Sequence, residues 1–147
     1  MTVTEPLVIL DASVVVAWFL TDEPSRVTAL ALGEAVRDKP RNYVVPPFFH
    51  SELVHVLARR SAKDARFVKS AIGLVLRLGL RTVSLSESAL LRTGHWACRG
   101  LSGYDATYVA LAEDLGGRWL TSDERAAKKA GPKFARTLAD WARKGRA

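Results

Sequence analysis

The chain has 147 residues, of which 48% are hydrophobic, which is enough for one compact domain around a single core. Its longest apolar run, residues 14–20, is far shorter than the roughly 20 residues that span a bilayer. Its one cysteine, Cys98, leaves no internal disulfide, and the first residues lack the basic start of a secretory signal. Together these features predict a soluble protein in a reducing cytoplasm, without a membrane partner.

Short apolar runs typical of buried strands alternate with segments of helical periodicity. Strands are expected at residues 7–10, 42–45, 80–85 and 118–121, with a weak final strand at 133–138. Helices are expected at residues 13–20, 24–36, 48–60, 63–78, 87–99 and 104–115, from 123 onward, and in a short segment after 138. This alternation predicts one α/β domain over residues 1–147, with a central parallel sheet of four to five strands and helices on both faces.

The net charge of +7 is concentrated at the C-terminal end. Residues 125–147 contain 8 basic residues and a single acid, Asp140, whereas positive and negative charges balance in the rest of the chain. A basic block of this kind fits contact with a polyanion such as nucleic acid. A solvated basic face explains the composition equally well.

Four acids lie at strand ends, at a helix start or on an apolar helical stripe, where a functional role is worth testing. Asp11 ends the first strand and Asp123 follows the strand at 118–121, so both should emerge at the same edge of a parallel sheet. Glu52 lies on an otherwise apolar helical stripe, and Asp105 lies three residues after Ser102 at a helix start. Singly, each has a structural explanation as a helix cap or as half of a salt bridge.

The spacing of Ser102 and Asp105 is that of a capping box, in which two side chains satisfy the free backbone N–H groups of the first helical turn. The same pattern recurs at Ser61/Asp64, Ser84/Glu87 and Thr121/Glu124. Asp105 can therefore be a helix cap, a catalytic acid or both.

The acids are harder to explain as a group. If the helices that carry Glu52 and Asp105 pack at the same sheet edge, the four carboxylates repel one another, and a bound divalent cation is the usual relief. An oxygen-only ligand set suits Mg²⁺ or Mn²⁺ better than Zn²⁺. The glycine-rich patterns G-x-x-x-x-G-K-[ST] and G-x-G-x-x-G are absent, which removes the common nucleotide-binding motifs. The four tryptophans are expected in the core, and no platform of interleaved aromatic and basic residues for base stacking is evident.

Four segments together, "ILDASVVVAWFL", "VPPFFHSELVHVLAR", "GLSGYDATYVALAEDLGG" and "LTSDERA", resemble the PIN-domain ribonucleases, and VapC toxins of bacterial toxin–antitoxin pairs in particular. The resemblance runs from about residue 7 to about residue 130. It implies a Mg²⁺- or Mn²⁺-dependent endoribonuclease that cuts structured RNA of the tRNA or rRNA class. It also implies that the protein forms a homodimer and that a VapB-like antitoxin binds it.

The resemblance also assigns roles. The catalytic and metal-binding acids fall on Asp11, Glu52, Asp105 and Asp123, and the hydroxyl groups that support them fall on Ser13 and Thr121. The family often has a large apolar residue shortly after the last acid, whereas Glu124, Arg125 and two alanines follow here, so Glu124 can share or replace the role of Asp123.

The same residues argue against two other function classes. An RNA-binding module without catalysis would have no use for four acids in a pocket that faces phosphate. A phosphotransfer domain with Asp11 as acceptor would be expected to carry a second Asp two residues on, where Ser13 stands, or an acid pair ahead of the acceptor strand, and it has neither.

Overall fold

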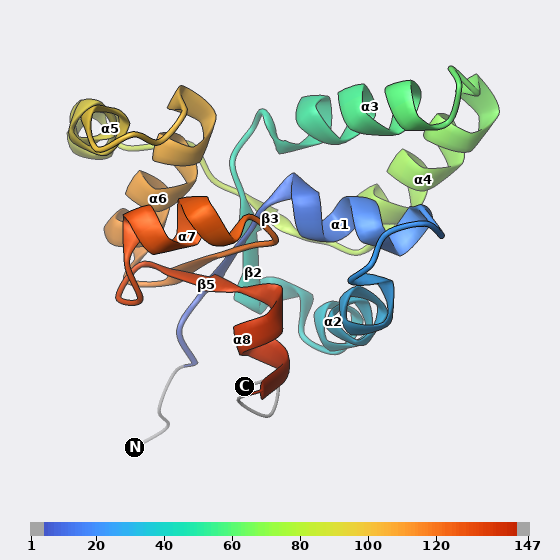
Figure 1. Cartoon of the computed structure of the whole chain (residues 1–147), viewed down its shortest axis with the longest axis horizontal. Coiled ribbons are helices and arrows are strands. Elements are labelled where there is room, and N and C mark those ends of the chain that lie inside the picture. Colours follow the sequence, from blue (N-terminus) through green and yellow to red (C-terminus); the bar gives the residue numbers. More distant parts are fainter. Residues whose placement is uncertain (1–4, 144–147) are drawn as a thin grey trace.

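The computed structural model describes residues 5–143, which form a five-stranded parallel sheet covered by helices on both faces (Figure 1). The strand order is β3-β2-β1-β4-β5. The strands are β1 (Val8–Leu10), β2 (Tyr43–Val45), β3 (Arg81–Thr82), β4 (Arg118–Thr121) and β5 (Ala135–Thr137). The helices are α1 (Ala12–Phe19), α2 (Arg26–Asp38), α3 (Phe49–Arg60), α4 (Ala65–Arg77), α5 (Glu87–Cys98), α6 (Gly103–Leu115), α7 (Glu124–Ala130) and α8 (Leu138–Arg143), with a 3-10 turn η1 (Pro40–Asn42) before β2. The predicted α/β fold is confirmed.

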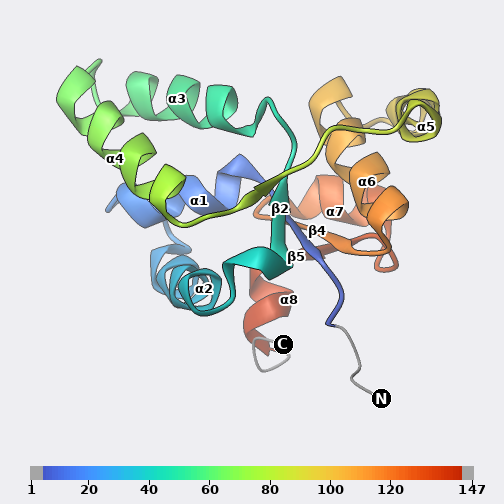
Figure 2. The ribbon, with the colours of Figure 1, turned by 180° about the vertical axis from the view of Figure 1, so that it is seen from behind.

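The central strands are buried on both sides and separate two apolar cores. Successive side chains of a strand point to opposite faces of the sheet. Leu10 and Leu120 pack in the core with α1–α4 and α8, whereas Ile9 and Trp119 pack in the core with α5–α7. Figure 1 shows α1–α4 on one side of the sheet and α5–α7 on the other, and Figure 2 shows the same division from behind. This double burial explains why these strands read as continuous apolar runs in the sequence.

The edge strand β3 differs from the central strands in length and burial. The segment predicted as a strand over 80–85 forms only the two-residue β3, both residues of which are exposed. β3 pairs only with β2, at the edge of the sheet. Beyond the two residues of β3, one further bond continues this pairing, from the N–H of Val83 to the carbonyl of Val45 at 3.0 Å. The weak strand predicted at the other end is confirmed as β5, which pairs in parallel with β4.

Three of the four expected capping boxes are wrong. The side chains that cap α4, α5 and α7 belong to Asp64, Ser86 and Asp123, not to the serines or threonine that begin the pattern. Each of these side chains lies directly before its helix and accepts a backbone N–H from the first turn. Only Ser102 acts as expected, since its hydroxyl accepts the N–H of Asp105 at 3.0 Å.

A close backbone contact marks the start of the pairing between β1 and β4. The N–H of Arg118 donates to the carbonyl oxygen of Leu7 at 3.1 Å. A Cβ atom added at Gly117 would overlap that same carbonyl oxygen, so only glycine fits there without moving the backbone.

Within residues 5–143, no helix is long and apolar enough to cross a lipid bilayer. The basic segment 125–147 includes most of α7 together with β5 and α8. Its residues 144–147 lie outside the described part of the chain.

Candidate active site

β1 and β4 end side by side, so Asp11 and Asp123 emerge at the same edge of the sheet, as the strand rule predicts, and Thr121 lies between them. Leu10 and Leu120 are paired in the sheet, and the N–H of Asp11 donates to the carbonyl of Leu120 at 3.1 Å. The hydroxyl of Thr121 donates to Oδ2 of Asp11 at 2.8 Å, and both residues are buried. The N–H of Asp123 in turn donates to Oγ1 of Thr121 at 3.1 Å. One threonine hydroxyl thus links the acids that follow the two central strands.

Ser13 holds the same two strand ends together from the side of α1. The other carboxylate oxygen of Asp11 caps α1 by accepting the N–H of Ser13 at 3.2 Å. The hydroxyl of Ser13 accepts the N–H of Ser122, beyond β4, at 3.1 Å. Ser13 and Thr121 therefore orient Asp11 relative to the loop between β4 and α7.

The electrostatic environment of Asp11 disfavours its ionised form. Burial raises the pKa of Asp11 to about 7, hydrogen bonds from Ser13 and Thr121 lower it, and the carboxylates of Asp105 and Glu52 raise it further. The charged groups that act on Asp11 are both acids. A cation bound beside Asp11 would relieve both the burial and the repulsion.

Glu52 lies in the first turn of α3 and is half-buried. Its Oε2 accepts a hydrogen bond of 2.8 Å from the phenol of Tyr108 on α6. Burial raises the pKa of Glu52, the Tyr108 bond lowers it, and the charge of Asp105 raises it. The partner of this acid on an apolar stripe is therefore a tyrosine rather than the cation of a salt bridge.

Asp105 lies in the first turn of α6, held by the cap at Ser102. Burial raises the pKa of Asp105, as does the charge of Asp123, whereas the Ser102 hydroxyl and the charge of Lys129 lower it. The ammonium of Lys129 donates to the carbonyl of Gly100 at 3.0 Å, in the loop that leads to α6. The backbone of Asp105 thus belongs to the helix cap, while its carboxylate acts on the other acids.

The structure distinguishes the two adjacent acids that follow β4. Asp123 caps α7 by accepting the N–H of Ala126 at 3.0 Å, and its charge acts on Asp105. Glu124 begins α7 and lines a separate hollow with Thr137 and other residues. Of the two, Asp123 is the one that is electrostatically linked to the acid group.

A pocket of about 730 Å³ opens beside these acids. Asp11, Ser13 and Glu52 line it together with the aromatic rings of Phe48 and Tyr104. Among residues 5–143, no set of three or more histidine, cysteine, aspartate or glutamate side chains is close enough together to hold a metal ion. The donors nevertheless fit Mg²⁺, which is commonly held by one or two carboxylates, with water and substrate phosphate as its remaining ligands.

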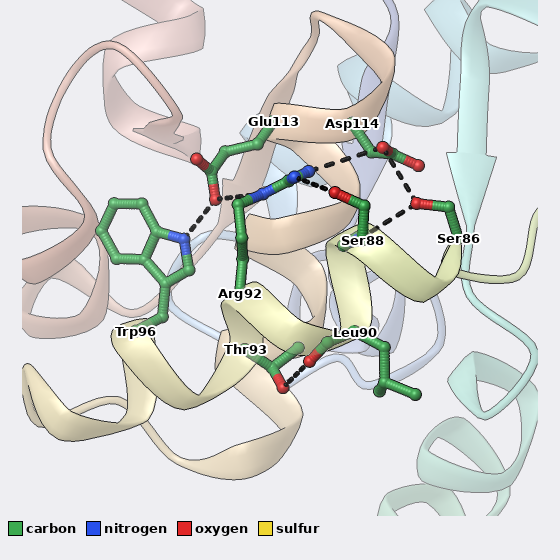
Figure 3. A network of polar contacts seen from close by, with 9 residues as sticks. Ser86, Ser88, Leu90, Arg92, Thr93, Trp96, Glu113 and Asp114 are labelled. Atoms are coloured by element: carbon green, nitrogen blue, oxygen red, sulfur yellow. Dashed lines mark hydrogen bonds and ion pairs between the residues drawn. The ribbon is translucent and has the colours of Figure 1, made fainter.

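The helix that carries Asp105 is tied to α5 by a polar network (Figure 3). Arg92 forms ion pairs with Glu113 at 3.7 Å and Asp114 at 3.4 Å, and the indole of Trp96 donates to Glu113. Ser86, which caps α5, also donates to Asp114, at 3.2 Å. This network fixes α5 against the C-terminal end of α6, where Glu113 and Asp114 lie.

Sequence reasoning missed the aromatic residues of the site. Tyr108 is fully buried, and its ring stacks on Trp119 at a centroid distance of 5.9 Å. Phe48 touches both Tyr108 and Tyr104 edge to face, at 5.3 and 5.4 Å. The signal in the sequence was the spacing of Tyr104 and Tyr108, which places two aromatics on one helical face around Asp105.

Comparison with known proteins agrees with this fold. VapC20 from Mycobacterium tuberculosis, a Sarcin-Ricin loop cleaving toxin, is 20% identical with a TM-score of 0.61, over 76% of this chain and 85% of that one. PAE2754 from Pyrobaculum aerophilum is 19% identical with a TM-score of 0.68, over 95% and 88%. DNA-bound VapBC from Salmonella typhimurium is 14% identical with a TM-score of 0.67, over 91% and 99%.

At these identities the structural neighbours show a shared fold. No curated protein sequence matches the chain. The sequence profile of the PIN domain, however, matches residues 8–132, which hold all four acids and every strand except β5. The chain therefore belongs to the PIN domain family.

Proposed function

We propose that this protein is a divalent metal-dependent endoribonuclease and the toxin of a VapBC-type pair. The observation that carries the proposal is the group of acids at the carboxyl edge of the sheet. Asp105 raises the pKa values of both Asp11 and Glu52, and Glu52 raises that of the buried Asp11 as well. Such a group is costly for a protein that only binds the phosphate backbone of RNA, and it is useful to one that binds a cation.

Asp11, Asp105, Asp123 and Glu52 are the residues that would hold Mg²⁺ or Mn²⁺. The chemistry that the metal supplies when bound is activation of a water and neutralisation of charge on the scissile phosphate. The protein's own groups set the positions of these acids. Thr121 and Ser13 orient Asp11, Tyr108 holds Glu52, and the cap at Ser102 places Asp105.

The assignment of a substrate and partners rests on the family and the structural neighbours. The neighbours include a toxin that cleaves the Sarcin-Ricin loop and VapBC complexes from several bacteria. We therefore infer that the substrate is structured RNA of the tRNA or rRNA class. We infer also that the protein is a homodimer silenced by a VapB-like antitoxin, and that the basic segment 125–147 contributes to RNA contact.

The alternative is an inactive PIN-like module that binds RNA. Cleavage of total RNA by the purified protein, with Mg²⁺ and with a chelator, separates the two. We expect cutting with the metal and none with the chelator. Asp105→Asn should abolish cleavage and leave the fold intact, because Asn keeps the volume of Asp and the backbone N–H that the Ser102 hydroxyl accepts.

Asp64→Asn is the matched control. Asp64 caps α4 by accepting the N–H of Phe67 at 3.1 Å, and Asn caps equally well there. This variant should cut RNA like the unmodified protein. RNA that is bound but left intact by the unmodified protein in every divalent metal would establish the inactive module instead.

A further inference from the structure

Tyr104 stands apart from the other aromatic residues of the chain. Of all the Phe, Tyr and Trp side chains in residues 5–143, it alone is exposed, at 62% of its surface. It lies in the first turn of α6, directly before Asp105, and it lines the pocket that contains Asp11 and Glu52. A large aromatic ring left in water at the edge of an acid site is suited to a ligand with an apolar face.

The ring is held rather than loose. Phe48, at the start of α3, meets it edge to face at 5.4 Å and 69°, and Phe48 is itself braced by the buried Tyr108 at 5.3 Å and 82°. Tyr104 is thus positioned from the side of α3, while most of its surface faces solvent. Pre-positioning of this kind lowers the entropy cost of binding a flat ligand.

The rest of the pocket is also less polar than a site for phosphate alone requires. Its lining includes Val16, Val56 and Phe48 next to the acids, and its volume of about 730 Å³ lies within the range typical of small-ligand sites. Acid groups and apolar surface in one pocket match the two parts of a nucleotide. The phosphate would approach the acids with a cation, and the base would meet the apolar surface.

We propose that Tyr104, supported by Phe48, is the stacking surface for a nucleobase adjacent to the cleaved phosphodiester. The proposal rests on the ribonuclease function proposed above and adds a restriction on the substrate. A base can present its face to a protein ring only after it has left its own stack, so the nucleotide at the cut must be unpaired. The restriction is one of shape and not of base identity, because every base has a π-face.

The test measures the affinity for a fluorescein-labelled single-stranded oligouridine by anisotropy. It uses the Asp105→Asn background with Mg²⁺, so that the RNA is not cut. Stacking of one base contributes about 1–3 kcal/mol, and about 1.4 kcal/mol corresponds to a tenfold change in affinity. Tyr104→Leu, which keeps an apolar side chain without a ring, should therefore weaken binding about tenfold or more. Tyr104→Phe should stay within about twofold.

The matched control is Leu91→Ala, at an exposed apolar residue of α5 that does not line this pocket. It should leave the affinity unchanged. A second measurement uses oligouridines with one abasic position each. At the stacked position, removal of the base should erase the difference in affinity between Tyr104→Leu and its parent, because the ring then has nothing to meet.

The outcomes separate this proposal from the function on which it rests. If the oligouridine binds Tyr104→Leu as tightly as its parent, the stacking surface is wrong and the ribonuclease stands. If Tyr104→Leu changes the oligomeric state and leaves RNA affinity unaltered, the ring belongs to a protein interface and the proposal is overturned. If the Asp105→Asn parent binds no RNA and the unmodified protein cuts none, the proposed ribonuclease function is itself wrong.

Discussion

The phenol of Tyr108 on α6 donates a hydrogen bond to Glu52 on α3. This bond joins two helices that lie on opposite sides of the sheet (Figure 1). Tyr108→Phe removes this donor and keeps the ring that stacks on Trp119. The stability should fall by about 1–2 kcal/mol, measured by urea unfolding, because the acceptor loses its bond. The pKa of Glu52, followed by carbon-detected NMR, should rise further, since the Tyr108 bond is the group that lowers it.

Tyr104→Phe is the control for this variant, because it removes a hydroxyl from an exposed tyrosine on the same helix. Its unfolding midpoint should not change. Equal losses of stability in both variants would mean that the bond between Tyr108 and Glu52 contributes nothing specific.

The stability of the metal-free protein should depend on the charge of Asp11. Folding raises the pKa of Asp11 to about 7, so the folded state holds a proton that the unfolded chain releases near pH 4. The contribution of this Asp11 proton to the free energy of unfolding is therefore complete below about pH 4 and is lost as the pH rises through 7. It amounts to roughly 4 kcal/mol at most, at about 1.4 kcal/mol per pKa unit.

Asp11→Asn cannot ionise and should remove this component. Thermal unfolding in the presence of a chelator, from about pH 4 to pH 8, is the measurement. The difference in Tm between the variant and the parent should grow in favour of the variant as the pH rises. A constant difference over this range would rule out the raised pKa of Asp11.

Stabilisation by metal should show the opposite pH dependence. A cation that binds the folded acids raises the Tm by mass action, and it must displace the proton from Asp11 to do so. Mg²⁺ or Mn²⁺ at millimolar concentration should therefore raise the Tm little near pH 5.5 and most near pH 8. The increase should shrink in Asp11→Asn, and an equal increase at both pH values would argue against Asp11 as a ligand.

Two glycine variants test the contact between β1 and β4. Gly117→Ala places a Cβ atom against the carbonyl of Leu7 and should destabilise the protein by about 1–3 kcal/mol, because backbone must move. Gly94→Ala, inside α5, meets no atom within 4 Å and should stabilise it by about 0.5–1 kcal/mol. Chemical unfolding of both variants gives the comparison, and a neutral Gly117→Ala would show that the strand pair tolerates displacement.

Much of the fold followed from local patterns, because doubly buried strands and amphipathic helices leave clear apolar signatures in the sequence. The shared sheet edge of Asp11 and Asp123 followed as well, since parallel strands present their carboxyl ends at one edge. The bond between Glu52 and Tyr108 did not follow, because the two residues are 56 positions apart in the sequence and meet only through the packing of α3 against α6. The helix caps failed for a local reason. Where a second Ser or Asp stands closer to the helix, as at Ser86 and Asp123, that side chain takes the cap.

The link between Thr121 and Asp11 spans 110 residues of sequence. One neighbour of β1, the strand β2, follows it early in the sequence. Its other neighbour, β4, is translated only after most of the protein has been synthesised. Contacts at such separation are slow to form, because a long loop must close before they add stability. The edge that gathers the four acids is therefore incomplete in a nascent or truncated chain, and the proposed ribonuclease can exist only once synthesis has passed β4.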